Sequence, residues 1–170
     1  MSTLKVGTIQ DHANSITAMT IDSTGRVLTP AKPSFFAHRR GQGTQSLSNN
    51  TFTLVQLNQV DHNIGNYFNT STYKFTCPVS GVYHFDTSLY IYSASQAEVR
   101  FYINDASKYR FASVKLGAER NPLSAGGGVT IQLSANDTVS VYAMAIGSSL
   151  AVYDGSGSES ASMFSGFLVG

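Results

Sequence analysis

The chain has 170 residues, of which 42% are apolar and only 12% are charged, and its formal net charge is +1. This length fits one domain with a small appendage, and the apolar content is enough to build a core. A nearly neutral chain without a basic stripe argues against nucleic acid as a partner. No apolar run approaches the roughly 20 residues of a membrane span, so membrane insertion is not expected.

The single cysteine, Cys77, cannot form a disulfide within the chain and is expected to be a small, buried apolar side chain. The N-terminal sequence Met-Ser-Thr-Leu-Lys-Val lacks the apolar run of a secretory signal peptide. The protein is therefore expected to be made in a cytoplasm and not to be exported by the standard route.

Residues 1–33 differ from the rest because their apolar side chains are scattered among Ser, Thr, Asp and Gly. Two short strands, at 16–22 and 26–29, with the turn sequence Asp22-Ser-Thr-Gly25 between them, predict a β-hairpin or an extended anchor. A lone hairpin is marginally stable in water, so this segment is expected to become ordered against a partner. The candidate anchor residues are Leu4, Val6, Ile9, Ile16, Ile21 and Val27.

Pro30 and Pro33 mark a domain boundary, after which residues 34–170 consist of short alternating strands and polar turns. In the strand that begins at Gly81, every second residue from Tyr83 to Ile91 belongs to one face, a period of two that is typical of a long strand. No segment has helical spacing beyond a turn or two. The pattern predicts an all-β protein built as a two-sheet antiparallel sandwich.

A spaced set of aromatic and small residues resembles the signature of a known family. The set is Asn63, Phe68, Phe75, Gly81, Tyr83 and Phe85, with the last-strand sequence Phe164-Ser-Gly-Phe-Leu. Residues 34–170 thus resemble the head domain of the C1q/tumour-necrosis-factor superfamily, which implies a jelly-roll sandwich, a homotrimer and a binding role without catalysis. Leu57 and Thr87 stand where that signature has aromatic residues, but both side chains suit buried sites.

Three tyrosines lie on the faces opposite the predicted core: Tyr90, Tyr92 and Tyr102. Exposed aromatic residues in a row are typical of a buried interface, so these residues are the candidate trimer contacts. The alternative is a scatter of surface tyrosines.

Candidate sites for chemistry are few. The four histidines have no Cys or carboxylate at metal-ligand spacing, and no phosphate loop or nucleophile elbow is present, so no catalytic residue is named and an enzyme is not expected. Several heads of the resembled family bind calcium through loop carboxylates. Asp154 and Glu159 lie in the matching loop and are the candidate calcium ligands; a solvated loop is the alternative, and no other cofactor is expected.

The sequences of residues 4–10 and 21–27, followed by a proline before an aromatic residue, resemble the start of structural proteins of tailed bacteriophages. We therefore expect a trimeric virion-surface protein, a fibre or spike head, in which residues 1–33 dock on other virion proteins. The head would bind a host surface molecule or glycan through its distal loops, at 41–50, 104–108, 117–128 and 154–160. The alternatives are a capsid decoration or cement protein and, with an export signal, a secreted C1q-like binding protein.

Overall fold

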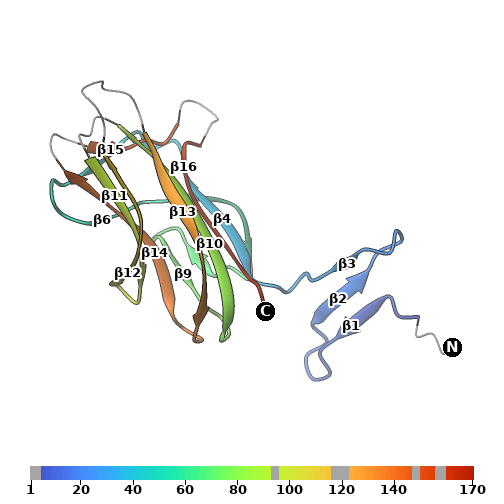
Figure 1. The fold of residues 1–170 in the computed structure, drawn as a ribbon. Coiled ribbons are helices and arrows are strands. Elements are labelled where there is room, and N and C mark those ends of the chain that lie inside the picture. Colours follow the sequence, from blue (N-terminus) through green and yellow to red (C-terminus); the bar gives the residue numbers. More distant parts are fainter. Residues whose placement is uncertain (1–4, 93–95, 116–122, 147–149, 156–159) are drawn as a thin grey trace.

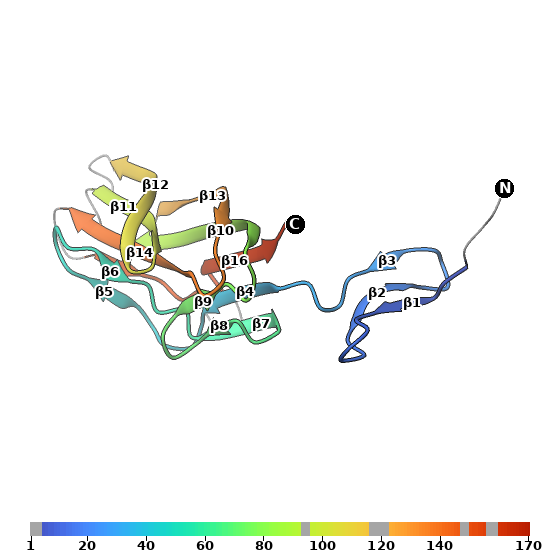
Figure 2. The same cartoon turned by 90° about the horizontal axis from the view of Figure 1, so that it is seen from below.

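The computed structural model describes residues 5–92, 96–115, 123–146, 150–155 and 160–170. In this part of the chain, every regular element is a β-strand. The strands form one small N-terminal sheet and two larger sheets that make up a head (Figure 1, Figure 2). The predicted all-β sandwich is confirmed.

The N-terminal sheet is a three-stranded antiparallel meander of β1 (Thr8–Gln10), β2 (Thr17–Ile21) and β3 (Val27–Leu28). The predicted hairpin corresponds to β2 and β3, and β1 adds a strand that the sequence did not indicate.

The turn between β2 and β3 is built around the carboxylate of Asp22. Its Oδ1 accepts hydrogen bonds from the backbone N–H groups of Arg26 (3.0 Å) and Thr24 (2.9 Å). Gly25 has a φ of 83°, a backbone conformation that glycine adopts without strain. The hydrogen bonds from Arg26 and Thr24 lower the pKa of Asp22 to about 2.

The first head sheet has seven strands in the order β5-β15-β10-β16-β4-β7, with β13 also paired to β10. They are β4 (Ser34–Arg39), β5 (Gln45–Leu47), β7 (Gln59–Ile64), β10 (Gly81–Tyr92), β13 (Leu123–Leu133), β15 (Leu150–Val152) and β16 (Ser162–Leu168). β10 is its longest strand and pairs with three others.

The second head sheet has six strands in the order β12-β11-β14-β9-β8, with β6 also paired to β14. They are β6 (Thr53–Leu54), β8 (Phe68–Asn69), β9 (Lys74–Thr76), β11 (Gln96–Ile103), β12 (Ala106–Lys115) and β14 (Thr138–Ile146).

The core lies between these two sheets. The alternation predicted for β10 is confirmed, because its inward residues are all buried: Tyr83, Phe85, Thr87, Leu89 and Ile91. Leu57 and Thr87 are buried as expected, and the Thr87 hydroxyl donates a hydrogen bond to the Met163 carbonyl at 2.8 Å. Cys77 is a buried free thiol, and burial raises its pKa to about 12, so it is protonated at neutral pH.

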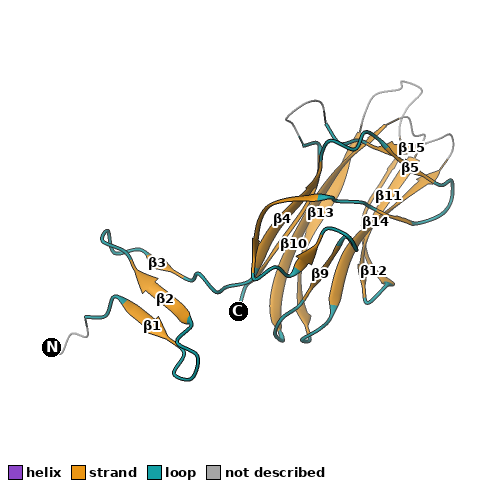
Figure 3. Cartoon of the chain, turned by 180° about the vertical axis from the view of Figure 1, so that it is seen from behind, coloured by secondary structure: helices purple, strands orange, loops and turns teal. Residues whose placement is uncertain are grey.

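The head has two distinct ends (Figure 1, Figure 3). We call the end where β4 and β10 begin and β16 ends the proximal end, because the N-terminal sheet and the C-terminus lie there. The distal end is where β10 ends and β11 and β13 begin.

Gly166 offers a test of the core packing. A Cβ at this position would lie 2.4 Å from Phe85 Cδ1 and 2.8 Å from Phe35 Cε1, whereas a Cβ at Gly7 would meet no atom within 4 Å. Because packed rings cannot move aside freely, we expect Gly166→Ala to lower the free energy of unfolding by about 1–3 kcal/mol. The control, Gly7→Ala, should change it by less than about 0.5 kcal/mol, measured by urea unfolding at one protein concentration. Equal stabilities for the two variants would contradict this packing.

Candidate interaction surfaces

One trio of side chains resembles a catalytic arrangement. The buried His38 ring lies between Asp61 and Ser160, with Nε2 3.0 Å from Asp61 Oδ1 and Nδ1 2.8 Å from Ser160 Oγ. His38 is fully buried, so its ring is not accessible to a substrate from solvent. Both ring nitrogens are bonded, and the trio holds residue 160 against β4 and β7.

Asp154, a predicted calcium ligand, has another role in the structure. Its carboxylate is buried, and Oδ2 accepts hydrogen bonds from the backbone N–H groups of Gln42 (2.9 Å) and Gly43 (2.7 Å). Glu159 lies outside the described residues, so the predicted pair itself is not tested. Within the described part of the chain, no group of three or more His, Cys, Asp or Glu side chains could hold a metal ion.

A buried arginine also holds the turn at residues 42 and 43, at the distal end. Arg39 donates hydrogen bonds from Nε to the Gly43 carbonyl (3.1 Å) and from Nη1 to the Gln56 carbonyl (3.0 Å). Burial lowers the pKa of Arg39, and the negative charge of Asp154 acts in the opposite direction. A buried guanidinium beside a buried carboxylate thus ties β4 to the loop that follows it.

The outer face of the seven-stranded sheet is weakly charged along β10, β13 and β16. On β10, His84 Nε2 lies 2.6 Å from Asp86 Oδ2, and His84 Nδ1 lies 2.8 Å from Thr130 Oγ1 of β13. The ring of Phe167 on β16 lies 5.4 Å from the His84 ring and is 46% exposed. This mixture of an exposed aromatic ring and paired polar groups is typical of a surface that contacts another protein.

Glycines of β13 allow this strand to lie close to β10 beside Asp86 and Ser88. A Cβ at Gly126 would lie 1.9 Å from the Thr87 carbonyl oxygen, and one at Gly128 would lie 2.3 Å from Asp86 Oδ1. Residues 117–128 are predicted from the sequence to form a distal loop. That assignment is wrong for residues 123–128, which are part of β13, because these glycines allow the strand to approach β10 closely.

The three candidate interface tyrosines do not form one row. Tyr90 lies on β10, with its ring 5.7 Å from that of Tyr153, whereas Tyr102 lies on β11 in the other sheet. The outer faces of the two sheets of a sandwich point in opposite directions, so these two residues belong to different surfaces. The side chain of Tyr92 lies outside the described residues.

The outer face of the six-stranded sheet carries an aromatic cluster that is satisfied within the chain. The Tyr102 and Tyr142 rings stack with centroids 3.9 Å apart, and the Arg100 guanidinium lies 4.2 Å from the centre of the Phe52 ring. Glu98 is buried between Arg100 and Arg110. These contacts account for the half-buried state of Tyr102 without a second protein.

The predicted distal loops divide between the two ends. Asp154 and the turn at 41–43 lie together at the distal end. The prediction that residues 104–108 are distal is wrong, because the Asn104 side chain bonds Asp137 (2.8 Å) and the Thr138 N–H (2.8 Å) where β14 begins. The β11–β12 hairpin turns at the proximal end (Figure 1).

A family model described as the C1q domain matches residues 34–169. The chain belongs to the C1q domain family. A search of curated proteins found no match. Among solved structures, the globular domain of zebrafish complement 1qA protein is similar, with 23% identity, a TM-score of 0.60, and coverage of 82% of this chain and 98% of that chain. The structure of Eiger TNF from S. frugiperda has 13% identity, a TM-score of 0.64, and coverage of 82% and 94%, respectively.

The family assignment confirms the predicted C1q/TNF-like jelly roll and the prediction that the protein is not an enzyme. C1q/TNF-like domains are non-enzymatic binding modules that commonly form homotrimers. The part of the chain that is described contains no helix long and apolar enough to cross a membrane.

Two sets of hydrogen-bonded side chains in this C1q head are not predicted from the sequence. His84 and Asp86 are two residues apart in a strand, a spacing that places both side chains on one face and that could have indicated their contact. His38, Asp61 and Ser160 are far apart in the sequence, and no local spacing indicates that they meet.

The contacts of Asp154 predict a structural role for its carboxylate. Asp154→Ala removes the acceptor of the Gln42 and Gly43 N–H groups and the negative charge beside buried Arg39, so we expect the free energy of unfolding to fall by about 2–4 kcal/mol. The control is Asp105→Ala, whose carboxylate forms an exposed ion pair and should contribute less than about 1 kcal/mol. The measurement is thermal unfolding without calcium. An Asp154→Ala chain as stable as the control would show that the carboxylate does not hold the turn.

Proposed function

We propose that this protein is a non-enzymatic, homotrimeric virion protein whose C1q head points outward and binds a host surface molecule or glycan. The membership of the head in a family of binding modules supports the binding role. The resemblance of residues 4–10 and 21–27 to the start of tailed-bacteriophage structural proteins supports the virion as the particle that carries it.

The polarity of the head is the observation that carries this proposal. The chain enters and leaves the head at the proximal end, where the Leu168 N–H bonds the Pro33 carbonyl (3.0 Å) and Lys32 Nζ bonds the Val169 carbonyl (2.9 Å). An attachment through the N-terminal segment therefore leaves the distal end of the head free. Three distal ends in each trimer, and many trimers on a particle, would raise the avidity for a repeated surface ligand.

Exposed apolar residues in the N-terminal segment support its role in attachment. Their exposed fractions are high: Ile9 48%, Ile16 56%, Ile21 43% and Val27 57%. Apolar side chains gathered in this way are typical of a contact surface. Val6 is half-buried, and Leu4 lies outside the described residues.

Removal of the N-terminal segment tests the attachment. A chain that lacks residues 1–31 keeps Lys32 and Pro33 in their contacts with the end of β16, so we expect a soluble head that no longer joins particles. The measurement is its copy number on particles assembled with the shortened chain, compared with the full chain. Incorporation at the full level would show that residues 1–31 are not the anchor.

Host binding is tested with paired substitutions at the two ends of the head. Thr44 is an exposed residue of the distal turn region, and Ala106 is an exposed residue of the proximal hairpin. We expect purified full chain to adsorb to cells of the host and to block infection, Thr44→Arg to weaken adsorption at least fivefold, and Ala106→Arg to leave it unchanged.

Two results would contradict the proposal, the first its distal binding surface and the second the binding role itself. A loss of adsorption with Ala106→Arg alone would place the binding surface at the wrong end. An absence of adsorption by the full chain, together with particles that break more readily without it, would favour the cement protein instead.

A further inference from the structure

One face of the N-terminal sheet is apolar at all of its paired positions, whereas on the other face the exposed Leu28 lies beside Thr20. The strand register pairs Ile9 of β1 with Met19 of β2, and Ile21 of β2 with Val27 of β3. Met19 and Ile21 are two residues apart, so they point to the same side of β2, and their cross-strand partners lie beside them. These four side chains, which we call the Ile21 face, occupy one side of the sheet.

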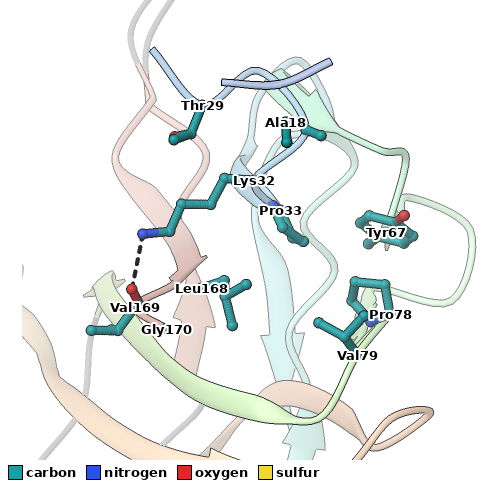
Figure 4. A pocket seen from close by; sticks show the side chains of 11 residues that line it. Ala18, Thr29, Lys32, Pro33, Tyr67, Pro78, Val79, Leu168, Val169 and Gly170 are labelled. Carbon is teal, nitrogen blue, oxygen red and sulfur yellow. Dashed lines mark hydrogen bonds between the residues drawn. The ribbon is translucent and has the colours of Figure 1, made fainter. Parts of the chain in front are cut away.

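The sheet approaches the head at Ala18, a residue of the irregularity between β1 and β2. Ala18 lines a hollow of about 400 Å³ together with Tyr67 and Val79 of the head (Figure 4). Nothing in the described chain covers the Ile21 face, where Ile9, Ile21 and Val27 are each more than 40% exposed. Uncovered apolar side chains on so small a sheet are typical of a contact surface.

We propose that the Ile21 face packs against the same face of the other two copies in the homotrimer, so that three N-terminal sheets form one closed body below the heads. This inference rests on the homotrimer of the proposed function. The apolar face of each copy is then covered by the same face of the other copies of this chain.

The short linker favours this occupant. Lys32 and Pro33 are bonded to the end of β16, so only residues 29–31 separate the sheet from a fixed point on the head. Three residues span at most about 10 Å. Cyclic symmetry places the three fixed points at one level and on one side of the trimer. The three sheets are therefore tethered to the same end of one trimer, which favours contact among them over contact with free molecules.

The charge distribution is also compatible with self-association. No residue of the Ile21 face is charged, so identical copies can meet there without like-charge repulsion. The nearby charges of Asp22 and Arg26 form an ion pair with each other, with Asp22 Oδ2 2.6 Å from Arg26 Nε. With the Ile21 face closed in this way, attachment to a virion protein rests on apolar residues outside it: Ile16, in the loop between β1 and β2, is 56% exposed, and Leu28, beside Thr20 on the opposite face, is 49% exposed.

Cross-linking of the full chain tests the inference. Ile21→Cys places a thiol on the middle strand of the Ile21 face, and Thr20→Cys places one on the neighbouring position of the opposite face. Cys77 is buried, so it does not compete for the reagent. With a short bifunctional maleimide, we expect Ile21→Cys to give covalent dimers from most trimers and Thr20→Cys to give at least fivefold less.

A charge substitution provides a second measurement on the same pair of positions. Ile21→Glu would bring three carboxylates together, so amide hydrogen exchange in β2 should accelerate at least tenfold, whereas Thr20→Glu should leave the exchange rate near that of the unsubstituted chain.

Light scattering distinguishes the possible failures. A trimer mass with equal cross-linking at both positions, or with unchanged exchange in Ile21→Glu, overturns the inference and leaves the proposed homotrimer intact. A monomer mass for the unsubstituted chain overturns the homotrimer itself.

Discussion

The phenylalanine cluster around Phe35 joins the two sheets of the head, and the remaining features depend on it. The Phe35 ring lies 5.0 Å from Phe68, 4.9 Å from Phe75 and 4.9 Å from Phe164. Its neighbours come from β8 and β9 of one sheet and from β16 of the other. Pro33 precedes this residue by two positions, so the packing of the core also fixes where the N-terminal segment leaves the head.

Once one face of each strand is buried in the core, the alternation of side chains along the strand determines which residues lie on the outer face. The inward position of Phe85 places its neighbours His84 and Asp86 outside, where they meet Thr130 and Phe167. The two outer faces differ in a way that matters for binding. One carries aromatic and arginine side chains that contact each other, and the other presents an exposed phenylalanine, Phe167.

The sequence predicted the sandwich and the core side of β10, because an alternating pattern is a local signal that burial enforces. Non-local contacts were not accessible in this way. Gln45 lies within residues 41–50, which the sequence predicts to be a distal loop, yet its side chain is buried and bonds the Leu54 carbonyl (2.7 Å) and the Gln56 N–H (2.8 Å). The role of Asp154 depends likewise on N–H groups more than a hundred residues away. From composition alone, such polar residues are predicted to be solvated. Their hydrogen-bond partners are known only once the chain is folded.

The position of β4 has a mechanical consequence. This strand begins at the proximal end directly after Pro33, runs toward the distal end, and is bonded on both sides, by β16 and β7. A force between a tether at the N-terminus and a ligand at the distal end would pull along β4. Antiparallel ladder bonds lie perpendicular to the strand, so such a load would shear many of them together instead of opening them one at a time. Resistance to such a load depends on how slowly the head unfolds under force. A head with this strand arrangement suits a protein that must stay folded while the particle that carries it is pulled.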